Sequence, residues 1–575
     1  MHTKKRPGLW LFVIVCACVA ATSEQGADAR VRHAARSRAD AVLAEFATAG
    51  HPGCAVGVYR DGRVLYEGAY GLANLENSVP IDPQLTVFEL GSVSKQFTAA
   101  SVLLLAHDTK LALDDDMRRY LPEMPDYGHV ITIDHLLHHT SALRDFTALR
   151  WMRGTSSWGY TTEQDIFALI ANQRGLNFSP GSKYAYSNTN YFLLAEIVQR
   201  VSGQTLAAFA HDRIFAPLGM DHTYFSDDLG RVTPHHASGY VLARSGAFEA
   251  RTSHAMEYGH SGVQSTVSDL ARWQRNFDEP TVGGAWLIQQ LEQNGVLTDG
   301  TRIEYARGVE VFEEGSGYRG ARTVVHSGAT WPGFRSDLMR LTRDRFSIAV
   351  LCNSDAQGAF EVRNPLVDIF MEDRFQDLPQ ATEAEREPDP DTLGPIGDVP
   401  SGMIGMYWNR EDATTRCIEL SDGKLWYVRS ADSRSQLVPI GNGQFRMLGR
   451  PTQTIVELLP SNGGPQVVRV VGGATTILER VEPFSTASNA LSDYAGVYTN
   501  SELGNGRIVL AVNDGRLVPI ASLEEIVALN PIFKDAFDVE GEALMVFQRD
   551  ASGQVTSLVL DHERARNIVF TRVSD

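Results

Sequence analysis

Lysine is scarce in this sequence, and the overall charge is strongly negative. Only 7 of the 52 basic residues are lysines, and the excess of acidic residues gives a formal net charge of −18. Nucleic-acid-binding proteins carry a basic surface, which this composition does not favour. The sequence therefore argues against a nucleic-acid partner, and each of the few lysines becomes a candidate for a specific role.

Cysteine is also scarce. Two of the five cysteines, Cys16 and Cys18, lie in an N-terminal apolar run, which leaves Cys54, Cys352 and Cys417 for the rest of the chain. Three cysteines do not form a disulfide framework for a chain of this size. Cys54 and Cys352 each lie in a strand-like apolar run, so we predict that both are buried as small hydrophobic side chains.

Only one long apolar run is present. Residues 9–21 follow the basic residues 4–6 and are succeeded by small residues. A run of this length is too short for a membrane span, which needs about 20 residues. It predicts a signal peptide over residues 1–21, hence a secreted or periplasmic protein with no stable membrane span in the mature chain. A short membrane anchor and a lipid anchor at Cys18 remain as alternatives.

Residues 30–378 mix helical and strand-like segments, and we expect them to form one catalytic domain of α+β class. The expected strands are residues 54–59, 63–69, 324–326, 335–341 and 346–352, and the expected helices are residues 94–106, 190–201, 268–277 and 362–371. Strands at both ends with helices between them predict a sandwich whose sheet joins the two ends of the domain. Residues 379–400 are rich in proline and acidic residues, which is typical of a linker.

Beyond the linker the chain repeats itself. Gly405 and Tyr407 match Gly496 and Tyr498, 91 positions later. Phe445 and Arg480 match Phe537 and Arg572, 92 positions later. Short apolar runs alternate with Asn, Asp and Gly turns in both copies. The repeat predicts two small antiparallel, barrel-like β-modules over residues 401–484 and 485–575.

A serine and a lysine stand three residues apart at the start of the expected apolar helix. In Ser92-Val93-Ser94-Lys95, the lysine lies one turn above the serine hydroxyl. A lysine buried by such a helix tends to lose its proton and becomes a base beside a nucleophile. The alternative is that Ser92 only caps the helix. A second Ser-x-x-Lys, Ser421 to Lys424, lies on an expected hairpin turn and predicts no site.

The order and separation of further motifs identify a resemblance. The motifs are residues 88–98, 136–141, 186–188 (Tyr-Ser-Asn) and 326–329 (His-Ser-Gly-Ala), the last leading to 332–334. Residues 42–371 resemble the serine β-lactamase and penicillin-binding-protein superfamily, and are most similar to the class C β-lactamase-related branch with its esterases and D-aminopeptidases. The resemblance implies the α/β sandwich of that superfamily, and the two trailing modules resemble the layout of three-domain D-aminopeptidases.

The resemblance implies a role for each catalytic position. Ser92 would be the acylated nucleophile, and Lys95 would take its proton. Tyr186 would share the base role and protonate the leaving group.

It also implies the residues that hold the substrate. Asn188, His326 and Gly328 would orient it, and the backbone N–H groups of Ser92 and Ala329 would form the oxyanion hole. No cofactor or metal is implied.

Two positions depart from the family pattern. His326 stands where β-lactamases carry a lysine, and an imidazole with an ordinary pKa is mostly neutral at pH 7.5. We therefore expect substrates with a free carboxylate to be poorer than neutral esters or amides. Ala142 stands where relatives have glycine, which puts the conformation of its loop in question. His135, His138 and His139 could suggest a metal site by spacing, but the resemblance implies none.

These observations predict a secreted serine hydrolase that acts on amide or ester bonds of small peptides or esters. A D-amino-acid peptidase or amidase, or an esterase, is favoured. The alternatives are a true β-lactamase or D,D-carboxypeptidase and, from another class, a non-catalytic binder or sensor of cell-wall fragments. The sequence does not give the oligomeric state.

Overall fold

The computed structural model describes residues 33–154, 160–243, 245–253, 258–376, 399–409, 414–430, 433–448, 454–459, 466–472, 474–484, 488–504, 506–521, 529–539, 541 and 543–573. The predicted signal peptide and nearly all of the predicted linker lie outside these residues. No helix within the described ranges is long and apolar enough to cross a membrane.

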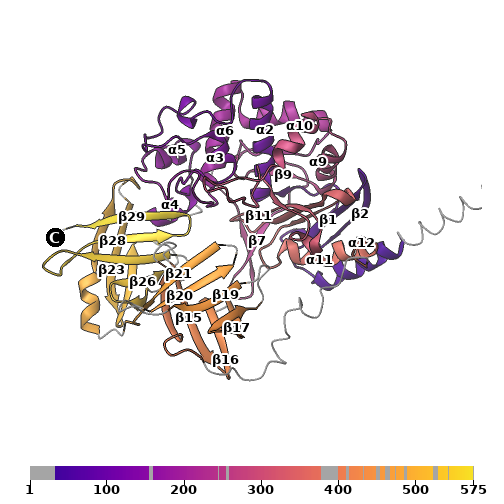
Figure 1. The fold of residues 1–575 in the computed structure, drawn as a ribbon. Helices are drawn as coiled ribbons and strands as arrows, with labels where there is room; N and C mark the ends of the chain where they lie inside the picture. The colour runs from indigo at the N-terminus through magenta and orange to yellow at the C-terminus, as the bar shows by residue number, and fades with distance from the viewer. Residues whose placement is uncertain are drawn as a thin grey trace, which may run out of the picture.

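A six-stranded antiparallel sheet forms the centre of the catalytic domain (Figure 1). Its order is β10 (Glu310–Phe312), β11 (Thr323–Ala329), β12 (Arg335–Leu341), β13 (Phe346–Cys352), β1 (Cys54–Arg60) and β2 (Arg63–Tyr70). Strand β1, from the start of the domain, pairs with β13 from its end. The predicted joining of the two ends in one sheet is confirmed.

Helices cover both faces of this sheet. Along β1, Ala55 and Tyr59 face the helical layer of α2 (Lys95–His107), whereas Val56 and Val58 face α11 (Ala359–Phe370). The alternation follows from the two-residue period of a strand. Figure 1 shows α2, α6 (Asn188–Ser202), α9 (Val267–Asp278) and α10 (Gly284–Leu291) on one side and α11 with α12 (Glu372–Gln376) on the other.

Other short elements complete the domain. They are β3 (Leu72–Asn74), β4 (Val79–Pro80), β5 (Phe88–Glu89), η1 (Gly91–Ser94), η2 (Met117–Arg119), α3 (Ile133–Leu137), α4 (Phe146–Arg153), α5 (Glu163–Ala171), α7 (Leu206–Ala210), η3 (His211–Phe215), α8 (Ala216–Leu218), β6 (Tyr224–Phe225), β7 (Gly239–Leu242), β8 (Phe248–Arg251), β9 (Val263–Ser265), η4 (Tyr318–Gly320) and η5 (Thr342–Asp344).

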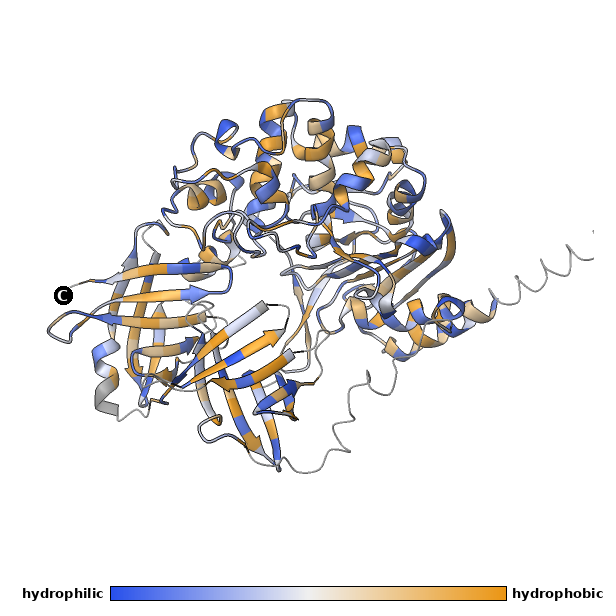
Figure 2. Ribbon diagram, viewed as in Figure 1, coloured by the Kyte–Doolittle hydropathy of each residue, from blue (hydrophilic) through white to orange (hydrophobic). Residues whose placement is uncertain are grey.

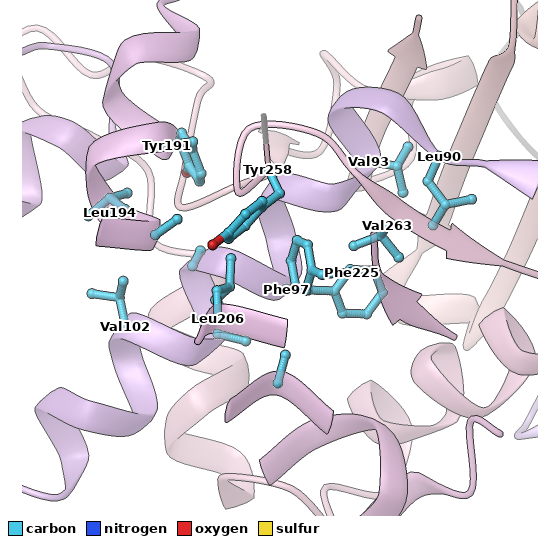
Figure 3. Packing of buried hydrophobic residues seen from close by; sticks show 14 of the residues in the cluster. Leu90, Val93, Phe97, Val102, Tyr191, Leu194, Leu206, Phe225, Tyr258 and Val263 are labelled. Carbon is cyan, nitrogen blue, oxygen red and sulfur yellow. The ribbon is translucent and has the colours of Figure 1, made fainter. Parts of the chain in front are cut away.

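Helix α2 is the centre of the main core. Figure 3 shows Phe97 and Val102 of α2 among Tyr191 and Leu194 of α6, with Leu206, Phe225, Tyr258 and Val263 around them. Residues 95–105 of α2 are all buried. A helix enclosed on every side gives a polar side chain on it no path to water, which matters for the lysine at its first turn.

Cys54 and Cys352 are bonded to each other, which corrects the expectation that they serve only as small hydrophobic side chains. They lie directly opposite on β1 and β13 and form a disulfide across 298 positions of sequence. The count of cysteines did not show which strands pair, and pairing brings these two together. Both are buried, as predicted, and Cys417 is free.

Two eight-stranded β-modules follow, and hydrophobic and hydrophilic residues alternate along their strands (Figure 2). The first is a closed barrel of β14 (Gly405–Asn409), β15 (Thr414–Ser421), β16 (Lys424–Ser430), β17 (Ser433–Gly441), β18 (Gln444–Met447), β19 (Thr454–Leu459), β20 (Val467–Gly472) and β21 (Ala474–Val481). The second follows η6 (Ser488–Tyr494) and holds β22 (Gly496–Asn500), β23 (Gly506–Asn513), β24 (Arg516–Ala521), β25 (Asn530–Phe533), β26 (Ala536–Val539), β27 (Ala543–Arg549), β28 (Val555–His562) and β29 (Ala565–Arg572). The two predicted barrel-like modules are confirmed.

The repeated residues join the first and last strands of each module. Tyr407 on β14 lies opposite Arg480 on β21, and Tyr498 on β22 lies opposite Arg572 on β29. Each tyrosine hydroxyl donates to a backbone carbonyl four or five residues earlier. Each arginine donates to carbonyls of the same segment. The repeat therefore preserves the contacts that join the first and last strands of each module, and these contacts need no catalytic explanation.

The second module shares a hydrophobic core with the catalytic domain. Leu149 and Met152 of α4 are buried against Leu503, Ile568 and other apolar residues of the module. Figure 1 shows β29 directly beneath α4. This packing holds the turn between β28 and β29 against the catalytic domain.

Candidate active site

Ser92 lies in a tight turn between the helical layer and β11. Gly91 before it has φ +52°, and a Cβ there would lie 2.8 Å from the backbone nitrogen of Ala329. A Cβ on Gly328 would lie 2.1 Å from the carbonyl oxygen of Leu90. Both glycines allow β11 to approach the turn, which brings the backbone of Ala329 beside that of Ser92. The N-cap positions of η1 and α2 are Leu90 and Ser94, so the interpretation of Ser92 as a cap was wrong.

Lys95 is enclosed completely, with 0% of its surface exposed. Its Nζ donates to Asn188 Oδ1 at 2.9 Å and to the carbonyl of His260 at 2.8 Å, and it lies 3.1 Å from Ser92 Oγ. Burial lowers the pKa of Lys95 well below its usual value; Asp145 opposes this shift and Arg564 adds to it. A neutral amine that uses two N–H groups on Asn188 and His260 keeps its lone pair for the Ser92 hydroxyl.

Tyr186 also lies beside the Ser92 hydroxyl. Its own hydroxyl is hydrogen-bonded to Ser92, and its ring centre is 4.7 Å from Lys95 Nζ. Burial raises the pKa of Tyr186, while the Ser92 hydrogen bond and the charge of Arg564 lower it. Ser92 therefore has a basic amine and a phenol as its two proton-exchanging neighbours.

His326 is held as a neutral ring. Nδ1 donates to the carbonyl of Ser327 at 2.7 Å, so Nε2 accepts from the hydroxyl of Tyr305 at 3.2 Å. Burial and the nearby Lys95 lower the pKa of His326 to about 3. The imidazole supplies no positive charge at neutral pH, in line with the sequence-based expectation.

Asp145 is a site residue that the sequence analysis missed. Its Oδ1 accepts from the N–H groups of Thr147 and Ala148 at the start of α4, and its Oδ2 accepts from the N–H of Asn188 at 2.5 Å. The buried carboxylate thus fixes the residue that binds Lys95. An acidic residue before a helix is a sequence signal for a cap, but nothing in the sequence connects it to Asn188.

Arg564 is a second missed residue, and it comes from the second β-module. The turn between β28 and β29 places its guanidinium carbon 5.3 Å from the ring centre of Tyr186. Its backbone carbonyl accepts from the N–H of Asp145 at 2.9 Å. No sequence signal could have linked it to a residue 378 positions earlier.

The three clustered histidines have separate partners. His135 closes a capping box with Thr132, and His138 bonds the carbonyls of Asp134 and Gln293. His139 lies with its ring 4.3 Å from that of Tyr186, and its Nδ1 accepts from Ser187 N–H. Burial lowers the pKa of His139 well below its usual value, so it is a neutral support for Tyr186.

Ala142 follows this segment with φ +65°, in the left-handed region. The loop therefore keeps the conformation that glycine favours, with a residue whose Cβ is sterically unfavourable there.

Residues 38–370 match the Beta-lactamase family. A D-aminopeptidase of Gluconobacter oxydans is 27% identical over 542 residues, covering 91% of this chain and 96% of the relative. A penicillin-binding protein of Bacillus subtilis is 29% identical over 407 residues, covering 67% and 85%. The structure of an octameric penicillin-binding-protein homologue from Pyrococcus abyssi shares the fold, with a TM-score of 0.51 at 20% identity over 77% of this chain and 98% of that one. The predicted superfamily and fold are confirmed: the chain belongs to the Beta-lactamase family, and it is a serine hydrolase.

Proposed function

We propose that this enzyme hydrolyses the amide bond after an N-terminal D-amino acid in small peptides and amides, through an acyl-enzyme on Ser92. The main structural support for this mechanism is that the buried Lys95 Nζ lies 3.1 Å from Ser92 Oγ. Support for the substrate class comes from the D-aminopeptidase of Gluconobacter oxydans, whose similarity extends through the catalytic domain and both modules.

The proposed reaction begins with proton transfer from Ser92 Oγ to neutral Lys95, as the oxygen attacks the substrate carbonyl carbon. The backbone N–H groups of Ser92 and Ala329 stabilise the oxyanion of the tetrahedral intermediate. The C–N bond then breaks as Tyr186 delivers a proton to the leaving amine, and Lys95 passes its proton to Tyr186 and becomes neutral again. Water attacks the acyl-enzyme and gives its proton to the neutral Lys95; as the C–O bond to Ser92 breaks, this proton returns to Ser92 Oγ and the acid is released.

Asn188 and His326 are proposed to orient the substrate amide, with Gly328 providing room beside Ser92. Esterase action would follow the same steps with an alcohol as leaving group. A true β-lactamase or D,D-carboxypeptidase remains the alternative, and the neutral His326 weighs against it because its ring gives no charge to a substrate carboxylate.

We also propose secretion or export to the periplasm, from the composition of residues 1–21, and a domain division at residues 30–378, 401–484 and 485–575.

The test is labelling and turnover on the full-length protein. A covalent serine inhibitor should add one adduct by intact-mass spectrometry, absent in Ser92→Ala, which separates an enzyme from a non-catalytic binder. D-alaninamide should then be hydrolysed at least tenfold better, in kcat/KM, than L-alaninamide and a chromogenic cephalosporin. An adduct that persists in Ser92→Ala, or a preference for the L-amide or the cephalosporin, would overturn the proposal.

A further inference from the structure

The turn between β28 and β29 reaches the active site as a firmly held element. The carbonyl of Arg564 accepts from Asp145 N–H and from Asn177 Nδ2 at 3.0 Å, and Arg566 N–H donates to Asn177 Oδ1 at 2.9 Å. Arg144 Nη2 donates to the carbonyl of Asn567 at 3.1 Å. These bonds use the backbone of the turn, so its position does not depend on the Arg564 side chain.

The Arg564 side chain is available for a ligand. It lies over Tyr186 and is 37% exposed, which places it at the boundary between the site and solvent. Its Nε donates to Glu563, whereas no described residue accepts a hydrogen bond from its two Nη groups. A guanidinium with both outer amino groups open is suited to binding a carboxylate through two parallel bonds.

The position of Arg564 beside Tyr186 indicates which part of a bound substrate it would contact. Tyr186 is the proposed donor to the leaving nitrogen, so a group above its ring adjoins the leaving group. In a dipeptide, the carboxylate is two bonds from that nitrogen. Around Ser92, burial lowers the pKa of both Lys95 and His326, whereas Arg564 brings a guanidinium to the ring of Tyr186.

We propose that Arg564, supplied by the second β-module, binds the free carboxylate of the leaving amino acid and makes dipeptides preferred substrates over their amides. The inference rests on the proposed function for the position of the leaving group. It opposes the expectation drawn from His326 alone, which considered only β11 and predicted poorer turnover of substrates with a carboxylate.

The experiment compares four substrates, D-alanylglycine, D-alanylglycinamide and their two L-counterparts, with the full-length enzyme. We expect kcat/KM for the free acid to exceed that for the amide. In Arg564→Gln the free acid should lose about tenfold while the amide changes by less than about threefold, because a charge-assisted bond at a partly exposed position is lost. Arg564→Lys should lose less than Arg564→Gln, since it keeps the charge without the fork.

The matched control is Arg516→Gln, which removes an exposed arginine at the start of β24 in the same module and should leave both rates unchanged. The amide substrate reports whether each variant is folded and active. An acid-to-amide ratio that is the same in wild type and Arg564→Gln would overturn the inference, even if D-substrates are hydrolysed. Selective hydrolysis of the L-series would overturn the proposed stereochemistry, while the acid-to-amide ratio in that series would still decide the role of Arg564.

Discussion

At the scale of single residues, burial in the site disfavours the charged forms of two basic side chains. Lys95 and His326 are both enclosed, and burial lowers the pKa of each. Asp145 is the buried anion that limits this effect at Lys95, because a nearby negative charge favours the ammonium form. The reactivity of Ser92 therefore depends on a carboxylate that does not contact it.

Asp145→Asn tests this dependence through the pH profile. Activity needs neutral Lys95, so kcat/KM should rise with pH through the pKa of that amine. Removing the carboxylate charge lowers this pKa further, and the rising limb should move to lower pH by roughly one unit. The maximum rate should also fall, because the introduced amide would face the N–H of Asn188 with a donor in place of one acceptor.

Asp269→Asn is the control for a buried carboxylate elsewhere. Asp269 accepts from His222 N–H and Thr223 in a separate part of the domain, and it does not contribute to the pKa of Lys95. This variant should lose stability without shifting the rising limb of the pH–rate profile. If the rising limb of the pH–rate profile did not shift in Asp145→Asn, Asp145 would have no electrostatic effect on Lys95.

At the scale of elements, the sequence located the regular parts well. The helix expected at residues 94–106 is Lys95–His107, and that expected at 190–201 is Asn188–Ser202, ending at Gly203 with φ +74°. Apolar periodicity and a terminal glycine are local signals, so they survive without knowledge of the fold. Helix α4 was missed because its apolar side packs on a module more than 300 positions later.

The same limit applies to the site. Ser92, Lys95, Tyr186 and Asn188 were found because each belongs to a short motif, and the structure brings them together. Arg564 stands in a turn with no motif, and Asp145 acts through the backbone of another residue. Long-range contacts of this kind are decided by packing, which a single sequence does not display.

The loop at Ala142 offers a test at this scale. With φ +65° the alanine has a steric cost that glycine would not have. Ala142→Gly should therefore raise the free energy of unfolding by about 0.5–1 kcal/mol, after the larger backbone entropy of glycine in the unfolded chain is subtracted. Ala168→Gly, in the exposed face of α5, is the matched control and should lower it by a similar amount. Denaturant titration measures both, and destabilisation by Ala142→Gly would contradict the argument.

At the scale of the whole molecule, the two modules are attached in different ways. The second shares a core with α4, whereas the main core of the first consists of its own residues. The first module contacts the second through a separate cluster that includes Trp408 and Phe533, with ring centres 5.1 Å apart. The disulfide between β1 and β13 independently links the first and last strands, in chain order, of the catalytic sheet. The second module is therefore the part whose docking bears on the active site.

The ion pair between Arg144 and Glu502 is the polar centre of that docking. Arg144 Nη1 donates to Glu502 Oε2 at 2.9 Å, and the same oxygen accepts from Arg174 N–H at 2.9 Å. The Arg144 side chain is only 5% exposed and that of Glu502 30%. Removing one partner of a largely buried pair leaves the other charge without compensation, which costs more than the loss of a surface pair.

Glu502→Gln keeps the shape of the side chain and removes its charge. We expect the docking of the second module to weaken by about 1–3 kcal/mol. Hydrogen exchange should accelerate in α4 and in residues 501–504, while the sheet centred on β1 and β13 should keep its protection. Because the turn carrying Arg564 is docked through the same interface, kcat/KM for D-alanylglycine should fall more than for D-alanylglycinamide. Glu482→Gln, an exposed partner of Arg480 in the first module, should change neither exchange nor turnover. Unchanged exchange in α4 of Glu502→Gln would show that apolar packing alone holds the module in place.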